Sequence, residues 1–277
     1  HQGPRGEEND DHAAWFAIAR PDRRQTVYIG VVADGVTSTN GGAQASRIAT
    51  ESIEAALRDL PDRQETLTEW LAAAIRSAND EILFEGKRQP EWQGMSTTVV
   101  LAALAGNRLY GLHLGDSRAY LHRNGHLHQL TTDHTWAQAA VASGILRAEE
   151  ADHHPGRNQL QRYLGSSRQL KIARAVLAPD TSYAEEYLLV VPGDRVLLCS
   201  DGLYHRLGRT TLETIVNQML SPQETTDALV QAAINQGEID DITALLFTVP
   251  TQDGERSQWA DAAPLPATDE DITVPVG

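Results

Sequence analysis

The chain has 277 residues, of which 41% are hydrophobic, and this is enough for one large core with residues left over. Its formal charge of −15 argues against a nucleic-acid surface, because phosphate backbones attract basic patches and the sequence shows none. The longest apolar run, 99–105, is too short to span a bilayer, and the single cysteine, Cys199, excludes an internal disulfide. We therefore expect a soluble, cytoplasmic protein.

The first part of the chain predicts a β-hairpin followed by two helices. Residues 13–19 and 26–33 are short apolar runs with β-branched and aromatic content, separated by a polar loop. Apolar residues then recur at helical spacing over 43–60 and 65–84, with Pro61 between the two segments. We expect an antiparallel pair of strands and then a pair of amphipathic helices.

The middle of the chain predicts a meander of strands. Four runs of strand-forming residues follow one another at 97–105, 108–114, 118–122 and 126–130, with Asn- and Gly-containing turns at 106–107 and 123–125. Because short turns join consecutive antiparallel strands, we expect all four to be antiparallel neighbours.

The rest of the chain alternates between helical and extended patterns. We expect helices at 135–143 and 148–153, strands near 171–177, 184–191 and 195–200, helices at 211–220 and 222–236, and a strand at 242–249. This order favours an α+β fold with packed sheets and outer helices over a parallel βαβ fold. After Pro250 the sequence is acidic, rich in Pro and Ala and without periodicity, which predicts a disordered tail or linker over 251–277.

Aspartates stand at the ends of several predicted strands. Asp34 and Asp201 each follow a buried run and precede a glycine, and Asp116 leaves a strand in a similar way. An isolated Asp-Gly pair is typical of a turn, and Asp201 alone could cap a helix. Their repetition, together with the acidic pairs Asp10-Asp11 and Asp240-Asp241, indicates a shared purpose.

Carboxylates gathered at the rims of sheets would repel one another unless cations neutralised them. A ligand set made only of oxygen favours hard ions such as Mg²⁺ or Mn²⁺ over zinc. The histidines do not cluster with the aspartates in the sequence, and His126 and His128 fall in a hairpin, where surface positions are typical. The sequence therefore predicts a site for Mg²⁺ or Mn²⁺ built from aspartates.

Seven short motifs are spread along the first 250 residues. They are Arg5 with Asn9-Asp10-Asp11, 32–35 leading to Gly42 and Ala45-Ser46, 96–98, 115–121, 130–134, 198–203 and 240–243. Each motif is unspecific alone, but the ordered set is highly specific. Over residues 1–250 the chain resembles the metal-dependent protein phosphatases of type 2C, bacterial branch.

The resemblance implies a fold and a domain division. The fold would be a four-layer αββα sandwich, in which two antiparallel sheets are flanked by helix pairs and a flap subdomain covers 137–162. Residues 1–250 would be the catalytic domain. The two ions, Mn²⁺ or Mg²⁺, would lie in a channel at one end of the sandwich.

The resemblance also implies the residues of the site. Its metal set comprises Asp10, Asp11, Asp34, Gly35, Asp116, Asp201 and Asp240. Asp34 would bridge both ions, Gly35 would contribute its carbonyl oxygen, and Asp201 and Asp240 would complete the protein ligands of one ion. Asp10 and Asp11 would hold metal-bound waters, and in bacterial relatives a third, weaker ion lies between the equivalents of Asp116 and Asp201. Arg5 would bind the phosphate, and Arg5, Asp11, Asp34 and Asp201 form the expected catalytic set.

The implied function is hydrolysis of phosphoserine and phosphothreonine by attack of a water that bridges the two ions. Phosphorylated proteins would be the substrates, a serine/threonine kinase the opposing partner, and we expect a monomer. A catalytically inactive signalling module on the same fold is the alternative, although such modules typically lose a metal aspartate that this chain keeps. An unrelated structural domain with turn-forming aspartates is a third reading.

Three positions depart from the family pattern. Val36 stands where many eukaryotic relatives have a histidine proposed as general acid, so the leaving-group proton must come from elsewhere. Arg5 is one residue further than usual from the acidic pair, which leaves both the role of Arg5 and the choice between Asp10 and Asp11 open. Asp241 replaces the usual asparagine and adds a negative charge to the phosphate site.

The charge at Asp241 leads to a prediction. An Asp241→Asn variant is expected to differ from the parent chain in metal affinity or in the pH dependence of activity, because a carboxylate beside the ions has been removed. Mn²⁺ titrations and pH–rate profiles of the two proteins measure this. Identical curves would contradict the prediction.

Overall fold

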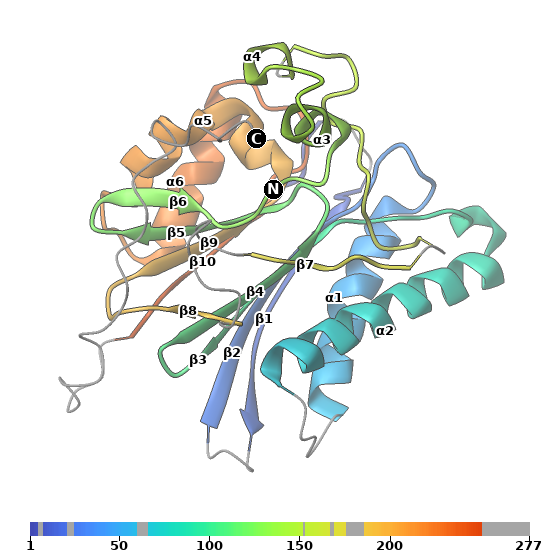
Figure 1. The fold of residues 1–277 in the computed structure, drawn as a ribbon, viewed down its shortest axis with the longest axis horizontal. Helices are drawn as coiled ribbons and strands as arrows, with labels where there is room; N and C mark the ends of the chain where they lie inside the picture. The colour runs from blue at the N-terminus through green and yellow to red at the C-terminus, as the bar shows by residue number, and fades with distance from the viewer. Residues whose placement is uncertain are drawn as a thin grey trace.

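The computed structural model describes residues 1–4, 8–20, 25–59, 66–151, 153–166, 169–175 and 186–250. Figure 1 shows them as a ribbon in which the strands lie between pairs of helices. Arg5 and the predicted tail at 251–277 fall outside the described residues. In the described part of the chain, no helix combines the length and the apolar character that crossing a membrane requires.

The predicted N-terminal hairpin is confirmed and begins the larger sheet. Its strands, β1 (Asp11–Arg20) and β2 (Gln25–Asp34), pair antiparallel over their full length. The sheet continues in the order β1-β2-β3-β4-β7, and β8 also pairs with β4. The added strands are β3 (Val99–Ala105), β4 (Arg108–Leu114), β7 (Ala173–Arg174) and β8 (Leu188–Leu189). β7 and β8 are much shorter than the strands predicted near 171–177 and 184–191, and 176–185 lies outside the described residues.

The second sheet has the strand order β10-β9-β5-β6, again with antiparallel pairing. Its strands are β5 (Arg118–Arg123), β6 (His126–Gln129), β9 (Arg195–Cys199) and β10 (Ala244–Thr248). β9 is buried along its whole length, because β10 and β5 lie on its two sides and the first sheet and the C-terminal helices cover its faces.

The prediction of one four-strand meander over 97–130 is wrong at its centre. β4 and β5 are consecutive in the chain, but they lie in different sheets. The chain crosses between the sheets at Gly115, whose φ of 104° favours glycine and whose missing Cβ would lie 2.6 Å from Thr98. Because β3, β4 and β5 are all largely buried, their apolar runs look alike and do not show which sheet each belongs to.

Two helix pairs cover the outer faces of the sheets. α1 (Gly42–Asp59) and α2 (Leu67–Arg88) pack on the first sheet, and α5 (Asp201–Val216) and α6 (Pro222–Asn235) pack on the second. A capping box starts α2 at Thr66 and another starts α6 at Ser221, so both helix ends keep their first N–H groups bonded. A 3₁₀ turn, η2 (Pro90–Trp92), follows α2.

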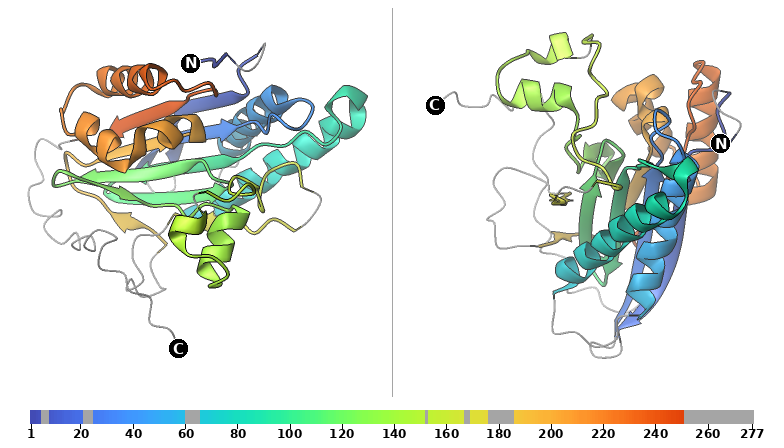
Figure 2. Two further views of the ribbon diagram at one scale, coloured as in Figure 1. Left: turned by 90° about the horizontal axis from the view of Figure 1, so that it is seen from above. Right: turned by 90° about the vertical axis from the view of Figure 1, so that its right-hand side faces the viewer.

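Three apolar clusters separate four layers, and this confirms the predicted αββα sandwich. One cluster joins the first sheet to α1 and α2, with Ile53 and Ile75 at its centre. The second lies between the sheets and contains Val32 and Leu198. The third joins the second sheet to α5 and α6. Figure 2 shows the helix pairs outside the sheets in two further views.

The helix predicted at 211–220 begins ten residues earlier than expected. α5 starts at Asp201, directly after β9, and its first turns bury Leu203 and Leu207. Gly208, with φ 64°, kinks the helix in the middle. The sequence pattern did not predict the first half of α5, because Gly208 interrupts the apolar spacing and glycine is typical of a helix end.

The two short helices of the flap segment are confirmed. They are α3 (Trp136–Ala142), which is capped by the Thr135 hydroxyl, and α4 (Ala148–Ala151). Figures 1 and 2 show this segment projecting beyond one end of the sheets. The flap segment therefore lies at the end of the sandwich where β2, β4 and β9 end.

A buried ion pair holds the opposite part of the second sheet together. The Arg123 guanidinium donates to both carboxylate oxygens of Asp194, and the two side chains are 7% and 2% exposed. We expect Asp194→Ala to lower the free energy of unfolding by about 3–5 kcal/mol, because the arginine would be left buried without its counter-ion. Urea unfolding measures this, with Glu54→Ala, which breaks the exposed pair with Arg58, costing less than about 1 kcal/mol. Equal effects of the two substitutions would contradict the prediction.

Candidate metal centre

The candidate site lies at one end of the layer between the two sheets. Side chains alternate along a strand, so Asp34 points to the same face of β2 as Val32, which is in the inter-sheet core. Asp11 lies directly opposite Asp34 in the β1–β2 pair. By the same alternation Ser200 follows Leu198 of the core. The apolar layer between the sheets therefore ends in a layer of polar side chains.

Threonines of the loop before β3 hold the backbone of Asp34. The Asp34 N–H donates to the Thr98 hydroxyl oxygen at 3.0 Å, and the Asp34 carbonyl accepts from the Thr98 N–H at 2.8 Å. The Thr97 hydroxyl donates to the same carbonyl at 2.8 Å. Thr98 also hydrogen-bonds the buried Ser117 across the two sheets at 2.6 Å. Asp34 therefore leaves its strand from a fixed backbone.

Ser200 ties three strand ends together on the other side of the layer. Its hydroxyl donates to the Asp11 carboxylate at 2.6 Å and accepts the Thr243 N–H at 3.0 Å. Asp201 comes next and forms the first residue of α5, where the helix dipole favours a negative charge. Its carboxylate also lies 3.3 Å from His205 Nδ1, one turn along the helix.

The carboxylates of this region interact strongly. Burial raises the pKa of Asp34 well above its usual value, and the charges of Asp11, Asp201, Asp116 and Asp240 raise it further. Burial likewise raises the pKa of Asp11 to about 7, against hydrogen bonds from Ser200 and Thr243 that lower it. The sequence-predicted aspartates, though far apart in the chain, are thus close enough to repel one another in the fold.

Asp10 and Asp241 lie in the same region of the site, but their carboxylates accept hydrogen bonds from other groups. Burial raises the pKa of Asp10, while hydrogen bonds from the Thr37 side chain and the Ala43 backbone at the start of α1 lower it. The Asp241 carboxylate accepts the Gly3 N–H with one oxygen and the Asp10 N–H with the other, each at 2.7 Å. Asparagine has only one acceptor oxygen, so the carboxylate at position 241 supports two backbone segments where an amide would support one.

Gly35 and Gly42 bring two backbones into contact next to Asp10. The Gly35 N–H donates to the Asp10 carbonyl at 3.0 Å, and a Cβ on Gly35 would lie 2.3 Å from the Gly42 oxygen. A Cβ on Gly42 would in turn lie 3.1 Å from the Asp10 carboxylate. Any larger residue at position 35 would push the loop after β2 away from the carboxylates, which explains the glycine in the Asp-Gly pair.

Asp116 approaches the corner from the crossover between the sheets. It is 6% exposed, and burial together with the charges of Asp201 and Asp133 raises its pKa. Its backbone carbonyl accepts the Tyr204 hydroxyl of α5 at 3.0 Å. The Arg118 guanidinium pairs with Asp133 at 2.6 Å and stacks 3.5 Å from the centre of the Tyr204 ring. These contacts fix the loop that carries Asp116 between α5 and the flap segment.

The donor set suits hard divalent cations. Among the described residues, no group of three His, Cys, Asp or Glu side chains is arranged so that it could hold one ion. The charges of Asp11, Asp201, Asp116 and Asp240 nevertheless raise the pKa of the buried Asp34. Cations would offset the repulsion among these carboxylates, and oxygen atoms are the donors that Mg²⁺ and Mn²⁺ prefer. The residues therefore fit the two ions that the resemblance implies.

Several residues of the site were not assigned an individual role from the sequence. Thr98, Ser117 and Ser200 form the polar layer beneath the aspartates. Their signal was available, since each continues the inward face of a strand just where the apolar residues stop. His134 accepts the Gly115 N–H at 3.1 Å, yet nothing in the sequence indicates this contact, because it depends on how the crossover between sheets packs. Arg5 lies outside the described residues.

The fold is an αββα sandwich with aspartates crowded at one end of its inter-sheet layer. The family model for protein phosphatase 2C matches residues 4–236. Relatives with similar sequences are named serine/threonine phosphatases. The chain belongs to the protein phosphatase 2C family.

The similar proteins are bacterial. The chain is 32% identical to the serine/threonine protein phosphatase PstP of Mycobacterium tuberculosis over 262 residues, which are 93% of this chain and 48% of PstP. It therefore spans about half the length of that relative. It is also 30% identical to the serine/threonine phosphatase stp of Listeria monocytogenes over 240 residues, which are 86% of this chain and 89% of that protein.

Solved structures confirm the fold. The S. agalactiae serine/threonine phosphatase superposes with a TM-score of 0.78 at 25% identity, covering 90% of this chain and 97% of the other. The catalytic domain of PstP in complex with two manganese ions superposes with a TM-score of 0.71 at 29% identity, covering 91% of this chain and 96% of that domain.

Proposed function

We propose that the chain is a metal-dependent protein phosphatase that hydrolyses phosphoserine and phosphothreonine, with residues 1–250 as its catalytic domain. The observation that carries the proposal is the mutual electrostatic interaction of Asp11, Asp34, Asp116 and Asp201 at the end of the inter-sheet layer. The family relationship and the names of the relatives support the reaction. The inactive alternative has no support from a missing carboxylate, because all of these aspartates are present.

Each carboxylate has a proposed task. Asp34 would contact both ions, with the Gly35 carbonyl completing one ion and Asp201 with Asp240 completing the other. A third, weaker ion would lie between Asp116 and Asp201. We take Mn²⁺ or Mg²⁺ as the ions, and the PstP domain with two manganese ions supports this choice. When bound, such ions lower the pKa of water and offset negative charge on a phosphoryl group.

Asp11 is the better candidate than Asp10 for holding metal-bound water. Asp11 interacts with Asp34 and Asp201. Asp10 interacts with Asp240 and Asp241 instead, and its carboxylate receives bonds from Thr37 and the first turn of α1. Asp10 would then serve mainly through its backbone, which contacts both Gly35 and Asp241. Both residues remain in the proposed metal set.

Arg5 is proposed to bind the phosphate of the substrate. A guanidinium offers two parallel N–H donors that match two phosphate oxygens, and the charge on a transferring phosphoryl group is spread over its oxygens. The described residues on either side support a position at the site, since Gly3 and Asp10 both bond to Asp241. Arg5 with Asp11, Asp34 and Asp201 forms the proposed catalytic set.

The wider setting is part of the proposal. Phosphorylated proteins would be the substrates, and a bacterial serine/threonine kinase would be the enzyme that the phosphatase opposes. The names of the relatives, which are serine/threonine phosphatases, support the choice of substrates. We propose that the domain acts in the cytoplasm as a monomer. The acidic segment 251–277 would serve as a tail or linker.

The test is hydrolysis of a phosphothreonine peptide by the purified chain. Phosphate release is expected with Mn²⁺, complete loss of release with a chelator, and recovery when Mn²⁺ is added in excess. A chain that turns over neither a phosphopeptide nor an aryl phosphate with Mn²⁺ or Mg²⁺ would refute the proposed function and favour the inactive module.

A further inference from the structure

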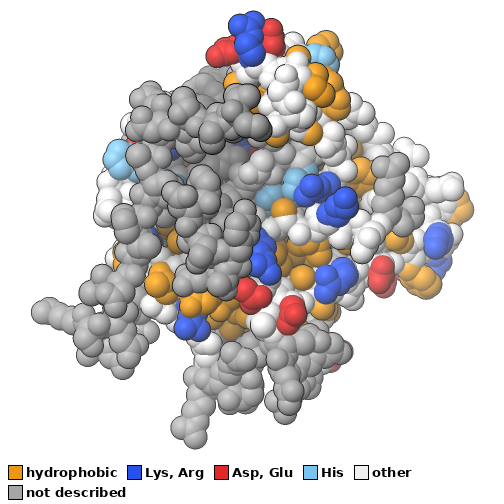
Figure 3. Space-filling model, in the orientation of Figure 1, with side chains coloured by type: hydrophobic (Ala, Val, Ile, Leu, Met, Phe, Trp, Pro, Cys, Tyr) orange, Lys and Arg blue, Asp and Glu red, His pale blue; other side chains and the backbone are white. Residues whose placement is uncertain are grey.

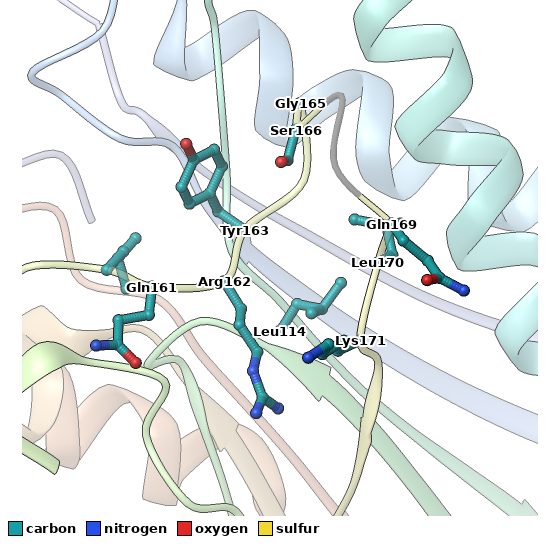
Figure 4. Close-up of a pocket in the computed structure, with 10 residues that line it drawn as sticks. Leu114, Gln161, Arg162, Tyr163, Gly165, Ser166, Gln169, Leu170 and Lys171 are labelled. Carbon is teal, nitrogen blue, oxygen red and sulfur yellow. The ribbon is translucent and has the colours of Figure 1, made fainter. Parts of the chain in front are cut away.

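A polar cavity of about 860 Å³ lies beside the flap segment, outside the carboxylate cluster. Figure 4 shows its lining, in which the polar members are Gln161, Arg162, Tyr163, Ser166, Gln169 and Lys171. Leu114 and Leu170 supply apolar walls, and none of the described lining residues is acidic. In a chain with a formal charge of −15, a cavity that combines two cations with neutral hydrogen-bonding groups is an exception.

The wall of this cavity is attached to the candidate metal centre. Leu164 and Thr97 exchange two backbone hydrogen bonds, at 2.8 and 3.2 Å, and the Thr97 hydroxyl donates to the Asp34 carbonyl. At its other end, the same segment pairs through Leu160 with Thr135, which caps the first flap helix. Leu114, on the floor, directly precedes the loop of Asp116. The cavity and the candidate metal centre therefore share the segments that carry Thr97 and Leu114.

The two cations have no acidic partner among the residues that the structure describes. Neither Arg162 nor Lys171 forms an ion pair there, and both are exposed. Figure 4 shows the Arg162 guanidinium and the Lys171 ammonium group, both drawn below the Leu114 side chain in this view. In Figure 3, Lys and Arg side chains gather near the middle of the same face, with His side chains beside them. Their charge is therefore available to a ligand.

The one polar contact of Arg162 with the residues that the structure describes is not a satisfied hydrogen bond. Arg162 Nη1 lies 3.0 Å from His134 Nε2, while the Gly115 N–H donates to Nδ1 of the same ring. A neutral imidazole has only one acceptor nitrogen, so Nε2 carries the proton and meets a second donor. Protonation does not help, because burial, His113 and Arg162 lower the pKa of His134 to about 3. An external anion would be a better partner for Arg162 than the histidine.

We propose that this cavity is a subsite for an anionic side chain of the phosphoprotein substrate, held by Arg162 and Lys171, a proposal that rests on the proposed phosphatase function. The anion is a carboxylate or a second phosphate close in sequence to the residue being dephosphorylated. Arginine can grip two oxygens of either group in parallel, and lysine adds a point charge. Gln161, Tyr163 and Gln169 can complete the hydrogen bonding.

The test compares peptides within one enzyme. Three phosphothreonine peptides are used that differ only in residues flanking the phosphothreonine, which are glutamine, glutamate or phosphoserine. We expect the parent chain to prefer an anionic peptide over the glutamine peptide by about three- to tenfold in kcat/KM, the size of one or two partly solvated ion pairs. The glutamate and phosphoserine arms distinguish a carboxylate from a second phosphate as the natural ligand.

Three variants assign the preference to the cavity. Lys171→Glu and Arg162→Gln are expected to bring the anionic-to-glutamine ratio to about one or below it. Lys87→Glu is the matched control, because Lys87 is the other lysine of the chain and lies exposed at the end of α2. It should keep the parent ratio. Using the ratio, rather than the rate, separates charge recognition from any effect of Arg162 on His134 and Gly115.

The outcomes separate the subsite from the proposed function. Hydrolysis of the glutamine peptide without a preference for either anionic peptide would overturn the subsite and leave the phosphatase standing. A preference that survives both Lys171→Glu and Arg162→Gln would also overturn it. Absence of hydrolysis of all three peptides with Mn²⁺ would refute the phosphatase proposal itself.

Discussion

Replacing Asp34 by asparagine is expected to lower kcat/KM for a phosphothreonine peptide by about a thousandfold or more. The charges of four other aspartates raise the pKa of Asp34, and this is more than for any other aspartate of the site whose pKa is shifted. In the proposed site it contacts both ions, so its loss weakens both. Ions that stabilise several kcal/mol of transition-state charge correspond to about three orders of magnitude in rate.

The matched control for this variant is Asp80→Asn. Asp80 lies exposed on α2, away from the carboxylates, and the substitution makes the same chemical change. It should leave kcat/KM within about twofold of the parent value, since an exposed carboxylate contributes little. If Asp34→Asn kept more than about a tenth of the parent activity at saturating Mn²⁺, Asp34 would not be a shared ligand.

The same substitution is expected to have opposite effects on stability with and without metal. In chelator, folding raises the pKa of Asp34 by burial and by four acidic neighbours. A carboxyl group with a raised pKa binds more protons in the folded state, so the free energy of unfolding falls as pH rises from about 4 through the folded-state pKa. Asp11, with a pKa of about 7, contributes in the same direction between about pH 4 and 7.

Asp34→Asn removes one of these charges and should therefore stabilise the metal-free protein at pH 8. One pKa unit corresponds to about 1.4 kcal/mol, and we expect a gain of that order, shrinking as pH falls toward 4. With Mn²⁺ the order reverses, because ions that bind only the folded state stabilise the parent chain and bind the variant weakly. Both proteins keep His113 and His134, so the titration of these buried histidines cancels in the difference.

Urea unfolding at pH 5 and pH 8, in chelator and in Mn²⁺, measures these four differences. A variant that is less stable than the parent in chelator at pH 8 would contradict the crowding of carboxylates. A parent chain that Mn²⁺ does not stabilise would contradict binding of the ions to the folded site.

The order of elements and the identity of the layers followed from local patterns. The hairpin of β1 and β2, the helix pair α1 and α2, and α6 with its Ser221 capping box all have clear periodicity or cap residues, and they form as predicted. Two assignments failed for a common reason. Gly115 turns the chain from one sheet to the other within a series of strands that looked like one meander, and Gly208 kinks a helix whose first half was not predicted. Only packing decides what each glycine does.

The candidate site was predictable in its acidic members and unpredictable in their supports. Asp34, Asp116 and Asp201 stand out because each follows a buried strand. The bonds of Asp241 to Gly3 and Asp10 could not be read from the sequence, because they join residues 231 and 238 positions apart. They also sharpen the expectation for Asp241→Asn, which loses a backbone acceptor as well as a charge.

Anomalous diffraction from crystals grown with Mn²⁺ tests the central claim most directly. The predicted result is two manganese peaks at the end of the inter-sheet layer, both in contact with the Asp34 carboxylate and one of them also with Asp201 and Asp240. Manganese bound elsewhere, or no manganese peak in contact with the Asp34 carboxylate at saturating Mn²⁺, would contradict it.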